Sequence, residues 1–485
     1  MTETLISALH SSFGMVPSDH QEQALCHFGR FLGESDKRSV FILRGAAGTG
    51  KTSLAAAFVR MLVRNGSPVV LLAPTGRAAK VFSLNSGQSA STIHRSIYRQ
   101  KSIDADGGSF TLNYNKLRHA FFFVDEASMI SHGTMGDRAF GKGSVLDDLV
   151  EFVYSGEGCR LVFIGDTVQL PPVGEERSPA LDTLVLEGYG LKVYESDLNE
   201  VLRQNRHSGI LWNATAIRSL VENATQRPVP RIRFNGFADV RMISGNELID
   251  QLMSSYDQVG MDEVMVITRS NKQANVYNRG IRQVILDREE EIERGDMLMI
   301  VKNKYFETSP ANTCSSAAGS DKPQTMKFVA NGDRARVVRV RKRHEFYGFH
   351  FAEVVLDFPD YENAELATTI ITDSLASDAP ALTAEQNEAL FQAVLADYED
   401  IPSKKERIRK VVRDDVYFGA LQVKYAYAIT CHKAQGGQWS HIYIDQGYMN
   451  ENMFDEAYIH WLYTAFTRAT NRLFLINWRP ELTLE

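Results

Sequence analysis

Short apolar runs alternate along the chain with amphipathic stretches, and this pattern predicts strands that alternate with helices. Short apolar runs at 39–43, 68–73, 119–125 and 160–166 each end in a polar or glycine-rich segment, and longer amphipathic stretches separate them. This alternation is typical of a parallel sheet with its binding loops at the carboxyl ends of the strands. We therefore expect an α/β domain from about 38 to 200, preceded by helices.

The pattern changes twice in the second half of the chain. A second α/β pattern starts near 205, and from about 300 the chain reads as short β segments with turns, followed by a charged helical stretch. The α/β pattern then resumes and continues to the end. We predict a first domain at 1–204, a second domain formed by 205–299 and 419–485, and an inserted, largely β module at 300–418.

The stretch GAAGTGKT at 45–52 follows the first apolar run directly and precedes an amphipathic one. A strand, a loop of the form G-x-x-x-x-G-K-[ST] and a helix form the arrangement that wraps backbone N–H groups around phosphate. We expect Lys51 at the β- and γ-phosphates and the Thr52 hydroxyl on Mg²⁺. The expected nucleotide contacts of the loop are Gly45, Ala46, Ala47, Gly48, Thr49, Gly50, Lys51 and Thr52.

Two later apolar runs also end in polar residues. FFFV is followed by Asp125 and Glu126, and LVFIG is followed by Asp166 and, three residues on, by Gln169. Beside a phosphate loop, Asp125 would hold Mg²⁺, Glu126 would activate the attacking water and Gln169 would respond to the γ-phosphate. The alternatives are a solvated pair of acids and a proline-rich loop without a role.

Composition limits the class of protein but leaves its partner open. The 485 residues are 44% hydrophobic and 23% charged, as in ordinary globular proteins. No apolar run approaches the ~20 residues that cross a membrane. Four scattered cysteines and an N-terminus without signal-peptide features indicate a cytoplasmic protein without a zinc or disulfide framework. The net charge of −7 disfavours a passive nucleic-acid coat but allows a local basic groove.

These motifs belong to an ordered series that runs nearly from end to end. Its members are PSDHQEQAL (17–25), GAAGTGKT (45–52), APTGRAAK (73–80), STIHR (91–95), VDEAS (124–128), GDTVQLPPVG (165–174), LNEVLRQ (198–204), YAYAITCHKAQGGQW (425–439) and LYTAFTRAT (462–470). The series resembles that of superfamily 1 DNA helicases. It is most similar to the 5′-to-3′ branch, which includes the RecD subunit of exonuclease V and the phage Dda helicase. The resemblance implies two RecA-like P-loop NTPase domains, with a small hairpin insert in the first and an SH3-like β insert in the second.

The resemblance also implies roles that spacing alone does not give. Gln21 is expected to read adenine, Gly436 to lie at the nucleotide, and Arg203 and Arg468 to reach the γ-phosphate from the second domain. A planar guanidinium offers several donors to the charge that develops on the γ-phosphate oxygens. For either arginine, an ordinary surface ion pair is the alternative.

A track for single-stranded DNA is implied in the same way. Short loops with hydroxyl and imidazole groups hold phosphates without reading bases. The expected track residues are Thr75, Thr92, His94, Thr430 and His432, with Lys80, Arg95, Lys272 and Lys433 as further contributors. A structural role is the alternative for each of them, and His94 would equally cap a helix.

The segment at about 97–118, with DGG as its turn, reads as a small hairpin. By resemblance it is the strand-separating pin, with Phe110 as a candidate wedge that stacks where a base pair opens. The alternative is that Phe110 packs the hairpin on its neighbour. The charged segment at about 383–413 matches no motif of the series and is expected to be a solvated face or a partner contact.

The sequence thus predicts an ATP-dependent DNA helicase that moves 5′ to 3′ on single-stranded DNA with Mg²⁺ and ATP as cofactors; the polarity rests on resemblance alone. The expected partners are single strands and duplex/single-strand junctions, with no membrane. The chain is expected to be a monomer that could join a larger repair or replication assembly. One alternative is a translocase that displaces proteins without processive unwinding. Another is a binding module in which ATP is only a switch.

Overall fold

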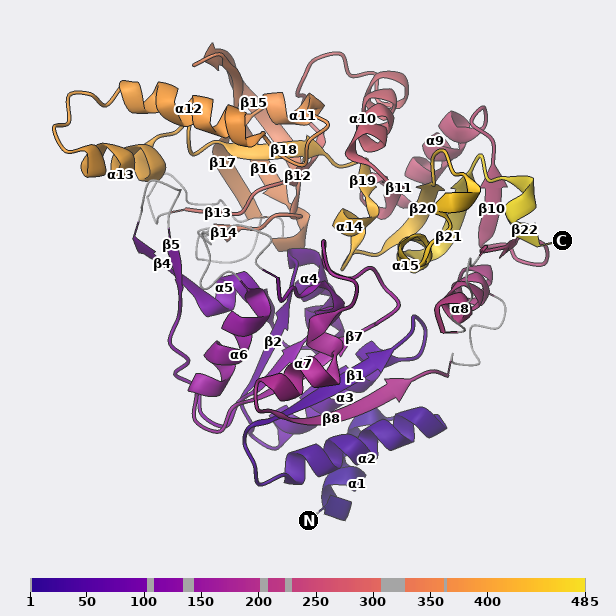
Figure 1. Ribbon diagram of the computed structural model, residues 1–485. Helices are drawn as coiled ribbons and strands as arrows, with labels where there is room; N and C mark the ends of the chain where they lie inside the picture. The colour runs from indigo at the N-terminus through magenta and orange to yellow at the C-terminus, as the bar shows by residue number, and fades with distance from the viewer. Residues whose placement is uncertain are drawn as a thin grey trace.

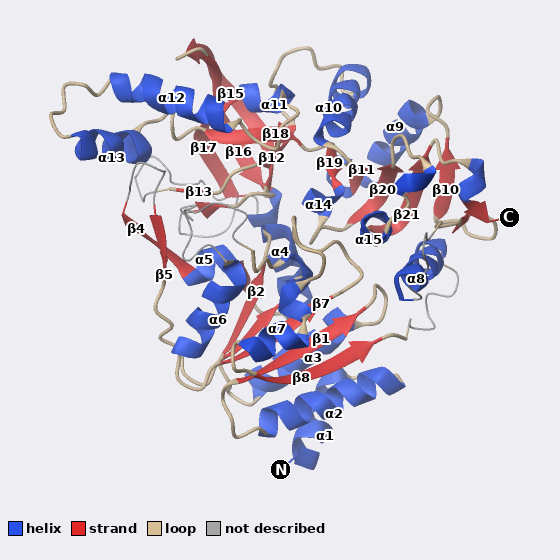
Figure 2. Cartoon of the chain, viewed as in Figure 1, coloured by secondary structure: helices blue, strands red, loops and turns tan. Residues whose placement is uncertain are grey.

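The computed structural model describes residues 2–102, 109–133, 144–200, 208–222, 229–306, 328–361 and 364–484. These residues form two parallel sheets flanked by helices and one closed β-barrel (Figures 1 and 2). In Figure 1 the first sheet lies at the bottom, the second at the right and the barrel at the upper left. The prediction of two α/β domains is confirmed.

Six parallel strands build the first sheet, in the order β3-β2-β6-β7-β1-β8. They are β1 (Ser39–Gly45), β2 (Val69–Ala73), β3 (Ala90–Thr92), β6 (Phe121–Val124), β7 (Arg160–Gly165) and β8 (Lys192–Leu198). Strands β1, β6 and β7 are buried along nearly their whole length, which explains why they read as unbroken apolar runs. Their carboxyl ends carry the phosphate loop and the two acidic motifs to one edge of the sheet.

Helices cover both faces of this sheet. They are α1 (Thr2–Phe13), α2 (Asp19–Gly33), α3 (Lys51–Arg64), α4 (Gly76–Ser86), α5 (Ile93–Ile97), α6 (Val145–Ser155) and α7 (Thr183–Gly188). Phe41 of β1 packs with α2 and α3, where the rings of Phe28 and Phe58 stack with centroids 3.8 Å apart. Its neighbour Ile42 packs into the core on the opposite face, with Leu149 of α6. Each such buried side chain contributes about 1.5–3 kcal/mol to the stability of the fold, so packing on both faces holds β1 in place.

Five parallel strands build the second sheet, in the order β10-β21-β20-β11-β19. They are β10 (Val240–Ile243), β11 (Val264–Thr268), β19 (Ala428–Thr430), β20 (Trp439–Asp445) and β21 (Ala469–Ile476). The accompanying helices are α8 (Gly209–Glu222), α9 (Leu248–Val259), α10 (Asn271–Gly280), α14 (Cys431–Ala434) and α15 (Glu456–Phe466). Strands β11 and β19 pair directly although the barrel separates them in sequence, so the barrel is an insert in this domain.

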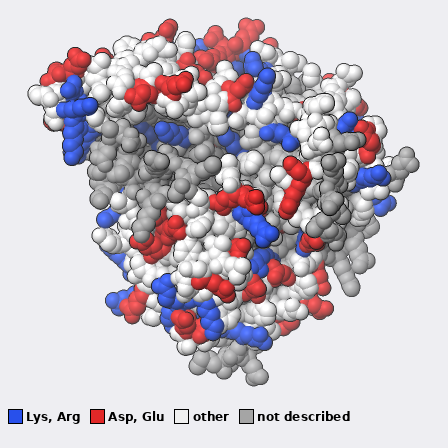
Figure 3. Space-filling view, viewed as in Figure 1, with Lys and Arg blue, Asp and Glu red and all other residues white. Residues whose placement is uncertain are grey.

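The barrel has the strand order β12-β15-β16-β17-β18. Its strands are β12 (Met297–Ile300), β15 (Arg334–Phe346), β16 (Phe349–Phe358), β17 (Ala364–Ile371) and β18 (Leu421–Tyr425). The charged segment forms α12 (Ala384–Ala396) and α13 (Lys404–Asp414), after the short α11 (Asp373–Ala376). Buried Val394 and Val411 pack these helices on Phe351 of the barrel. Basic side chains of α13 gather at the upper left of Figure 3, so an acidic chain carries a local basic surface.

A two-stranded antiparallel sheet of β4 (Tyr98–Ser102) and β5 (Ser109–Leu112) lies in the segment where the sequence predicts a hairpin. The DGG turn lies outside the described residues. The backbone of Phe110 pairs with Gln100, and the Phe110 side chain lies outside the description, so its role as a wedge stays a prediction. Among the described helices, none combines the length and apolar character needed to span a bilayer.

Candidate nucleotide site and strand track

The phosphate loop joins β1 to α3 through turns that suit glycine. Gly48 and Gly50 have φ of 76° and 84°, in the left-handed region. Gly45 has no room for a side chain, because a Cβ there would lie 2.8 Å from Thr49 Oγ1 and 2.9 Å from Leu198 Cβ. Within the part of the chain that the structure describes, no side chain caps α3, so its first backbone N–H groups are left for a ligand. A helix start of this kind is a ready anion site.

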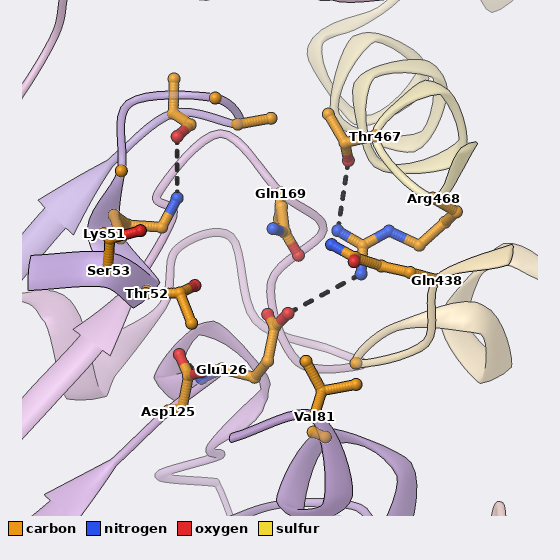
Figure 4. A pocket seen from close by; sticks show the side chains of 17 residues that line it. Lys51, Thr52, Ser53, Val81, Asp125, Glu126, Gln169, Gln438, Thr467 and Arg468 are labelled. Atoms are coloured by element: carbon orange, nitrogen blue, oxygen red, sulfur yellow. Dashed lines mark hydrogen bonds and ion pairs between the residues drawn. The ribbon is translucent and has the colours of Figure 1, made fainter. Parts of the chain in front are cut away.

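Lys51 folds back over this loop. Its Nζ donates to the carbonyl oxygens of Gly45 and Ala46 at 2.5 and 2.9 Å and lies 4.0 Å from Asp166 Oδ2 (Figure 4). The ammonium group is therefore at the mouth of the loop, with two weak carbonyl partners. A phosphate group would be a stronger partner for the same charge.

Gln21 supports the loop from behind. Its Nε2 donates to the Thr49 carbonyl oxygen at 3.0 Å, and its Oε1 accepts the Ser18 N–H at 3.1 Å in the capping box that begins α2. Gln21 is buried and is not among the residues that line the cavity between the two α/β domains. Its expected role as the adenine reader therefore stays a prediction.

A cavity of about 280 Å³ lies between the two α/β domains, and it brings most of the predicted nucleotide residues together (Figure 4). From the first domain it is lined by Ala46, Ala47, Gly48, Gly50, Lys51, Thr52, Ser53, Ala78, Val81, Asp125, Glu126, Gly165 and Gln169. From the second domain it is lined by Gly436, Gln438, Thr467 and Arg468. Both halves of the site thus come from one chain.

The acidic pair lies at the end of β6. Glu126 has φ 52° and ψ 40°, a left-handed conformation that a residue with a side chain adopts at a cost. Burial and the neighbouring Glu126 carboxylate raise the pKa of Asp125 well above its usual range, and Lys51 opposes the shift. Thr52 shares the cavity wall with Asp125. A hydroxyl and a carboxylate are oxygen ligands that Mg²⁺ accepts. A cation there would offset the cost of burying the ionised Asp125 carboxylate, so the residues fit that metal.

Arg468 approaches the acidic pair from the second domain. It is 2% exposed, and its Nη1 lies 3.8 Å from Glu126 Oε1. Its nitrogens also donate to the carbonyl oxygens of Thr464 and Gly437 and to the Thr467 hydroxyl, at 3.1 to 3.2 Å. These bonds hold the guanidinium in the orientation that Figure 4 shows, facing the phosphate loop across the cavity.

Gln169 lies between Lys51 and Arg468 in the cavity (Figure 4). The side chain is 5% exposed, and its Oε1 has no hydrogen-bond partner among the described residues. Leaving a buried acceptor unsatisfied costs about 1–3 kcal/mol, so the position suits a donor brought by a ligand or a water molecule. Arg203, the other expected arginine, lies outside the described residues, and its role stays a prediction.

The expected track residues follow the carboxyl ends of parallel strands in both domains. Thr75 caps α4 after β2, and Thr92 caps α5 after β3. Thr430 occupies the N-cap position of α14 after β19, without a cap hydrogen bond from its side chain. A Cβ on Gly436 would lie 2.8 Å from Thr75 Oγ1, so the loops of the two domains meet across the cleft.

The two track histidines are neutral at pH 7. Burial lowers the pKa of His94 to about 4 and also lowers the pKa of His432. They would therefore hold a phosphate by hydrogen bonding rather than by charge. Burial and the neighbouring Lys424 lower the pKa of Lys433 to about 8. Lys433 therefore still carries its charge at pH 7, and the positive charge of the expected track would come from lysines and arginines rather than from the two histidines.

Among those basic residues, Lys80, Arg95 and Lys272 are exposed. Lys80 also contacts the barrel, where its Nζ donates to the Pro359 carbonyl oxygen at 2.6 Å and lies 3.9 Å from Asp360. The helix that carries Thr75 is therefore in contact with the insert as well as with the second domain.

The sequence did not predict several other cavity or cleft residues, among them Gln438, Thr467 and Tyr463. Gln438 and Thr467 line the cavity, and the Tyr463 hydroxyl lies 3.0 Å from the Ala47 nitrogen. Tyr463 and Thr467 are four residues apart in the motif that carries Arg468, so both lie on one side of a helical turn. That spacing was a usable signal.

Family models match two parts of the chain. A model described as an AAA domain matches residues 18–237, and one described as a UvrD-like helicase C-terminal domain matches residues 425–476. The first covers the phosphate loop and both acidic motifs. The second covers the motifs with Gly436 and Arg468.

Curated relatives share low to moderate identity with the chain. An uncharacterised protein of Methanocaldococcus jannaschii is 23% identical over 91% of this chain, which spans only 37% of that relative. The ATP-dependent DNA helicase dda of Enterobacteria phage T4 is 24% identical over 64% of this chain and 65% of its own length. The ATP-dependent RecD2 DNA helicase of Deinococcus radiodurans is 34% identical over 27% of this chain and 16% of its own.

Among solved structures, a Pif1 helicase from Bacteroides aligns over 97% of this chain and 95% of its own, at 14% identity and a TM-score of 0.45. The assignment of this chain rests instead on the two family models and on the helicase relatives, which agree with the ordered motifs. Together with the ordered motifs, these matches support a superfamily 1 helicase of the RecD and Dda type.

Proposed function

We propose that this chain is an ATP-dependent DNA helicase that translocates 5′ to 3′ on single-stranded DNA and unwinds duplex. One observation carries the proposal. Arg468 of the second domain faces Glu126 of the first at 3.8 Å, inside a cavity whose other wall is the phosphate loop. An active site split between two domains makes hydrolysis depend on their approach. The 5′-to-3′ direction follows from the resemblance of the ordered motifs to that branch, and the matches to the Dda and RecD2 helicases are consistent with it.

In this proposal each residue of the cavity has its own role in ATP hydrolysis. Lys51 and the free N–H groups of α3 hold the β- and γ-phosphates, and Thr52 and Asp125 would hold Mg²⁺, which neutralises phosphate charge when bound. Glu126 takes a proton from the attacking water. Gln169 orients that water, and Arg468 leaves Glu126 to stabilise the charge on the γ-phosphate.

Nucleotide turnover then moves DNA because the track is divided in the same way as the nucleotide site. Thr75, Thr92 and His94 belong to the first domain, and Thr430 and His432 belong to the second. Closure of the cleft on ATP and reopening after hydrolysis would shift one set against the other along a strand. The hairpin of β4 and β5 lies on the first domain, where it would meet a duplex/single-strand junction.

The working form in this proposal is a monomer in a reducing cytoplasm. Each part of the nucleotide site comes from the same chain, so a second copy is not needed for chemistry. The described cysteines, Cys26, Cys159 and Cys431, are free. Membership of a larger repair or replication assembly would add partners to this unit without altering the site.

The proposal is tested by measuring ATP hydrolysis with and without a single-stranded oligonucleotide, with Lys51→Ala as the control for the site. We expect hydrolysis that needs Mg²⁺, rises severalfold with the strand and is absent in the variant. Hydrolysis of equal rate in Lys51→Ala would reject the site. Hydrolysis that ignores DNA would reject the motor in favour of a nucleotide switch.

A further inference from the structure

The loop from Asp166 to Leu170 leaves β7 of the first domain but is anchored in the second. Val168 and Leu170 are buried in the core of the second domain. Thr464 Oγ1 accepts the Leu170 N–H at 2.8 Å, and a ring nitrogen of His460 lies 2.7 Å from the Val168 carbonyl oxygen. Both chain neighbours of Gln169 are thereby fixed to helix α15. The part of the loop that enters the nucleotide cavity therefore moves with the second domain.

Tyr463 extends this attachment to the phosphate loop itself. Its side chain is 1% exposed, and its hydroxyl accepts the Ala47 N–H at 3.0 Å and donates to Asp166 Oδ2 at 2.7 Å. Asp166 is buried, accepts the Val168 N–H at 3.1 Å through Oδ1, and lies 4.0 Å from Lys51 Nζ. A continuous chain of contacts thus runs from α15 through one hydroxyl to both the loop backbone and the catalytic lysine.

The position of the hydroxyl suits coupling rather than simple packing. Ala47 and Lys51 both line the cavity that would hold the phosphates, and Tyr463 contacts Ala47 without lining that cavity itself. Burial and the nearby Asp166 raise the pKa of Tyr463, so the hydroxyl keeps its proton and can donate and accept together. Without it, one buried Asp166 oxygen would lose its donor and draw on Lys51 instead, away from the γ-phosphate.

We propose that Tyr463 is a positioning residue that transmits the placement of the second domain to the phosphate loop and to Lys51. The inference rests on the proposed function, because the signal it carries is the domain approach that DNA would promote. DNA binding would fix the position of the second domain, and α15 would thereby position Tyr463. The Tyr463 hydroxyl donates to the Asp166 oxygen that also lies near Lys51, so the lysine is left for the γ-phosphate.

The test is Tyr463→Phe, which removes one oxygen and keeps the ring. We expect the DNA-stimulated kcat to fall about tenfold, as expected when a buried acceptor loses its donor, while KM for ATP changes less than about threefold. Tyr458→Phe is the matched control. Tyr458 lies on the same helix with 1% exposure, and its hydroxyl donates to Gln446 at 2.7 Å within the second domain. Thermal unfolding of both variants shows whether each is folded.

A second variant separates coupling from loss of stability. Since Tyr463 acts through Asp166, the pair Tyr463→Phe with Asp166→Asn should lose no more kcat than the more severe single variant. Equal stimulation by DNA in Tyr463→Phe and Tyr458→Phe, or fully additive losses in the pair, would overturn the inference.

Hydrolysis by the wild-type chain, with and without DNA, tests the proposed function by itself. If wild-type hydrolysis ignores DNA, that proposal fails. The inference is then decided by basal kcat, which must still fall in Tyr463→Phe relative to Tyr458→Phe.

Discussion

At the residue scale, Glu126 combines a strained backbone with a charge that faces Arg468. Its left-handed conformation turns the side chain out of the strand direction and toward the second domain. In the structure the carboxylate pairs with the arginine that hydrolysis would need. During turnover Arg468 would therefore leave Glu126 and bind the γ-phosphate.

Glu126→Gln tests the role of this carboxylate. The amide keeps the size of the side chain but cannot take a proton, so we expect kcat for ATP to fall by about 10²–10⁴-fold. Nucleotide affinity, measured by fluorescence anisotropy with a labelled ATP analogue, should be retained. Retained hydrolysis would show that another group activates the water.

Arg468→Lys tests the arginine with its charge preserved. A lysine cannot reproduce the three donated hydrogen bonds or face the γ-phosphate with a planar fork, so we expect a loss of about 10³-fold or more in kcat. Arg479→Lys is the control, since Arg479 donates to the Met449 carbonyl oxygen away from the cavity. A loss of less than tenfold in Arg468→Lys would contradict the assignment.

The sequence predicted most of these residues because Lys51, the acidic pair and Gln169 follow apolar strands, while Arg468 came from the resemblance of its motif to the helicase series. Lys51, Asp125, Glu126, Gln169 and Arg468 line a single cavity. It missed Tyr463, because a contact between residues more than 400 positions apart depends on how two domains dock. Strand patterns carry no information about that docking.

At the element scale, α4 and α14 meet at the cleft through a residue without a side chain. Gly436 has φ of 71°, and a Cβ there would lie 2.8 Å from Thr75 Oγ1 and 3.1 Å from Ala78 Cβ. Any larger residue must push the two domains apart. Figure 1 shows both helices at the centre of the molecule, between the two sheets.

Comparison of Gly436→Ala with Gly447→Ala therefore separates the effect of backbone strain from the effect of a wider cleft. Gly447→Ala is matched for strain, since Gly447 has φ of 67°, but it faces only the flexible end of Gln273 in its own domain. We expect similar losses of melting temperature and a drop in DNA-stimulated hydrolysis in Gly436→Ala alone. Equal activity of the two variants would argue that the cleft tolerates the wider spacing.

Elements of the barrel were harder to read from the sequence than those of the parallel sheets. The run MLMI of β12 is buried throughout, and an unbroken apolar run of this length reads the same in a barrel as in a buried parallel strand. Its pairing with β15 and β18 depends on residues far along the chain. The α/β order, by contrast, follows from local alternation alone.

At the scale of the whole molecule, the barrel contacts the first domain through a buried acid. Asp333 accepts the Ala330 N–H at 2.6 Å and the Tyr361 hydroxyl at 2.8 Å, and its Oδ1 would lie 2.6 Å from a Cβ on Gly76 of α4. Burial raises the pKa of Asp333 to about 7, with Asp360 adding to the shift and Arg95 opposing it.

This contact predicts a pH dependence of stability. An unfolded Asp titrates near ~3.9, so between about pH 4 and 7 the folded chain keeps a proton that the unfolded chain loses. Asp333 thus makes the free energy of unfolding fall as pH rises through that window. Asp333→Asn should flatten the change in melting temperature between pH 5 and 7 and raise stability at pH 8. The exposed Asp257→Asn should do neither, and an unchanged slope in Asp333→Asn would refute the assignment.

A motor that moves 5′ to 3′ along single strands should separate only duplexes that carry a 5′ tail. Two short duplexes, one with a 5′ and one with a 3′ single-stranded tail, are incubated with the chain and Mg²⁺-ATP, and strand separation is followed, with Lys51→Ala in parallel. We expect the wild-type chain to unwind the 5′-tailed duplex alone and Lys51→Ala to unwind neither. Unwinding of only the 3′-tailed duplex would contradict the direction. Strand-stimulated hydrolysis with no unwinding of either duplex would leave a translocase and contradict the helicase.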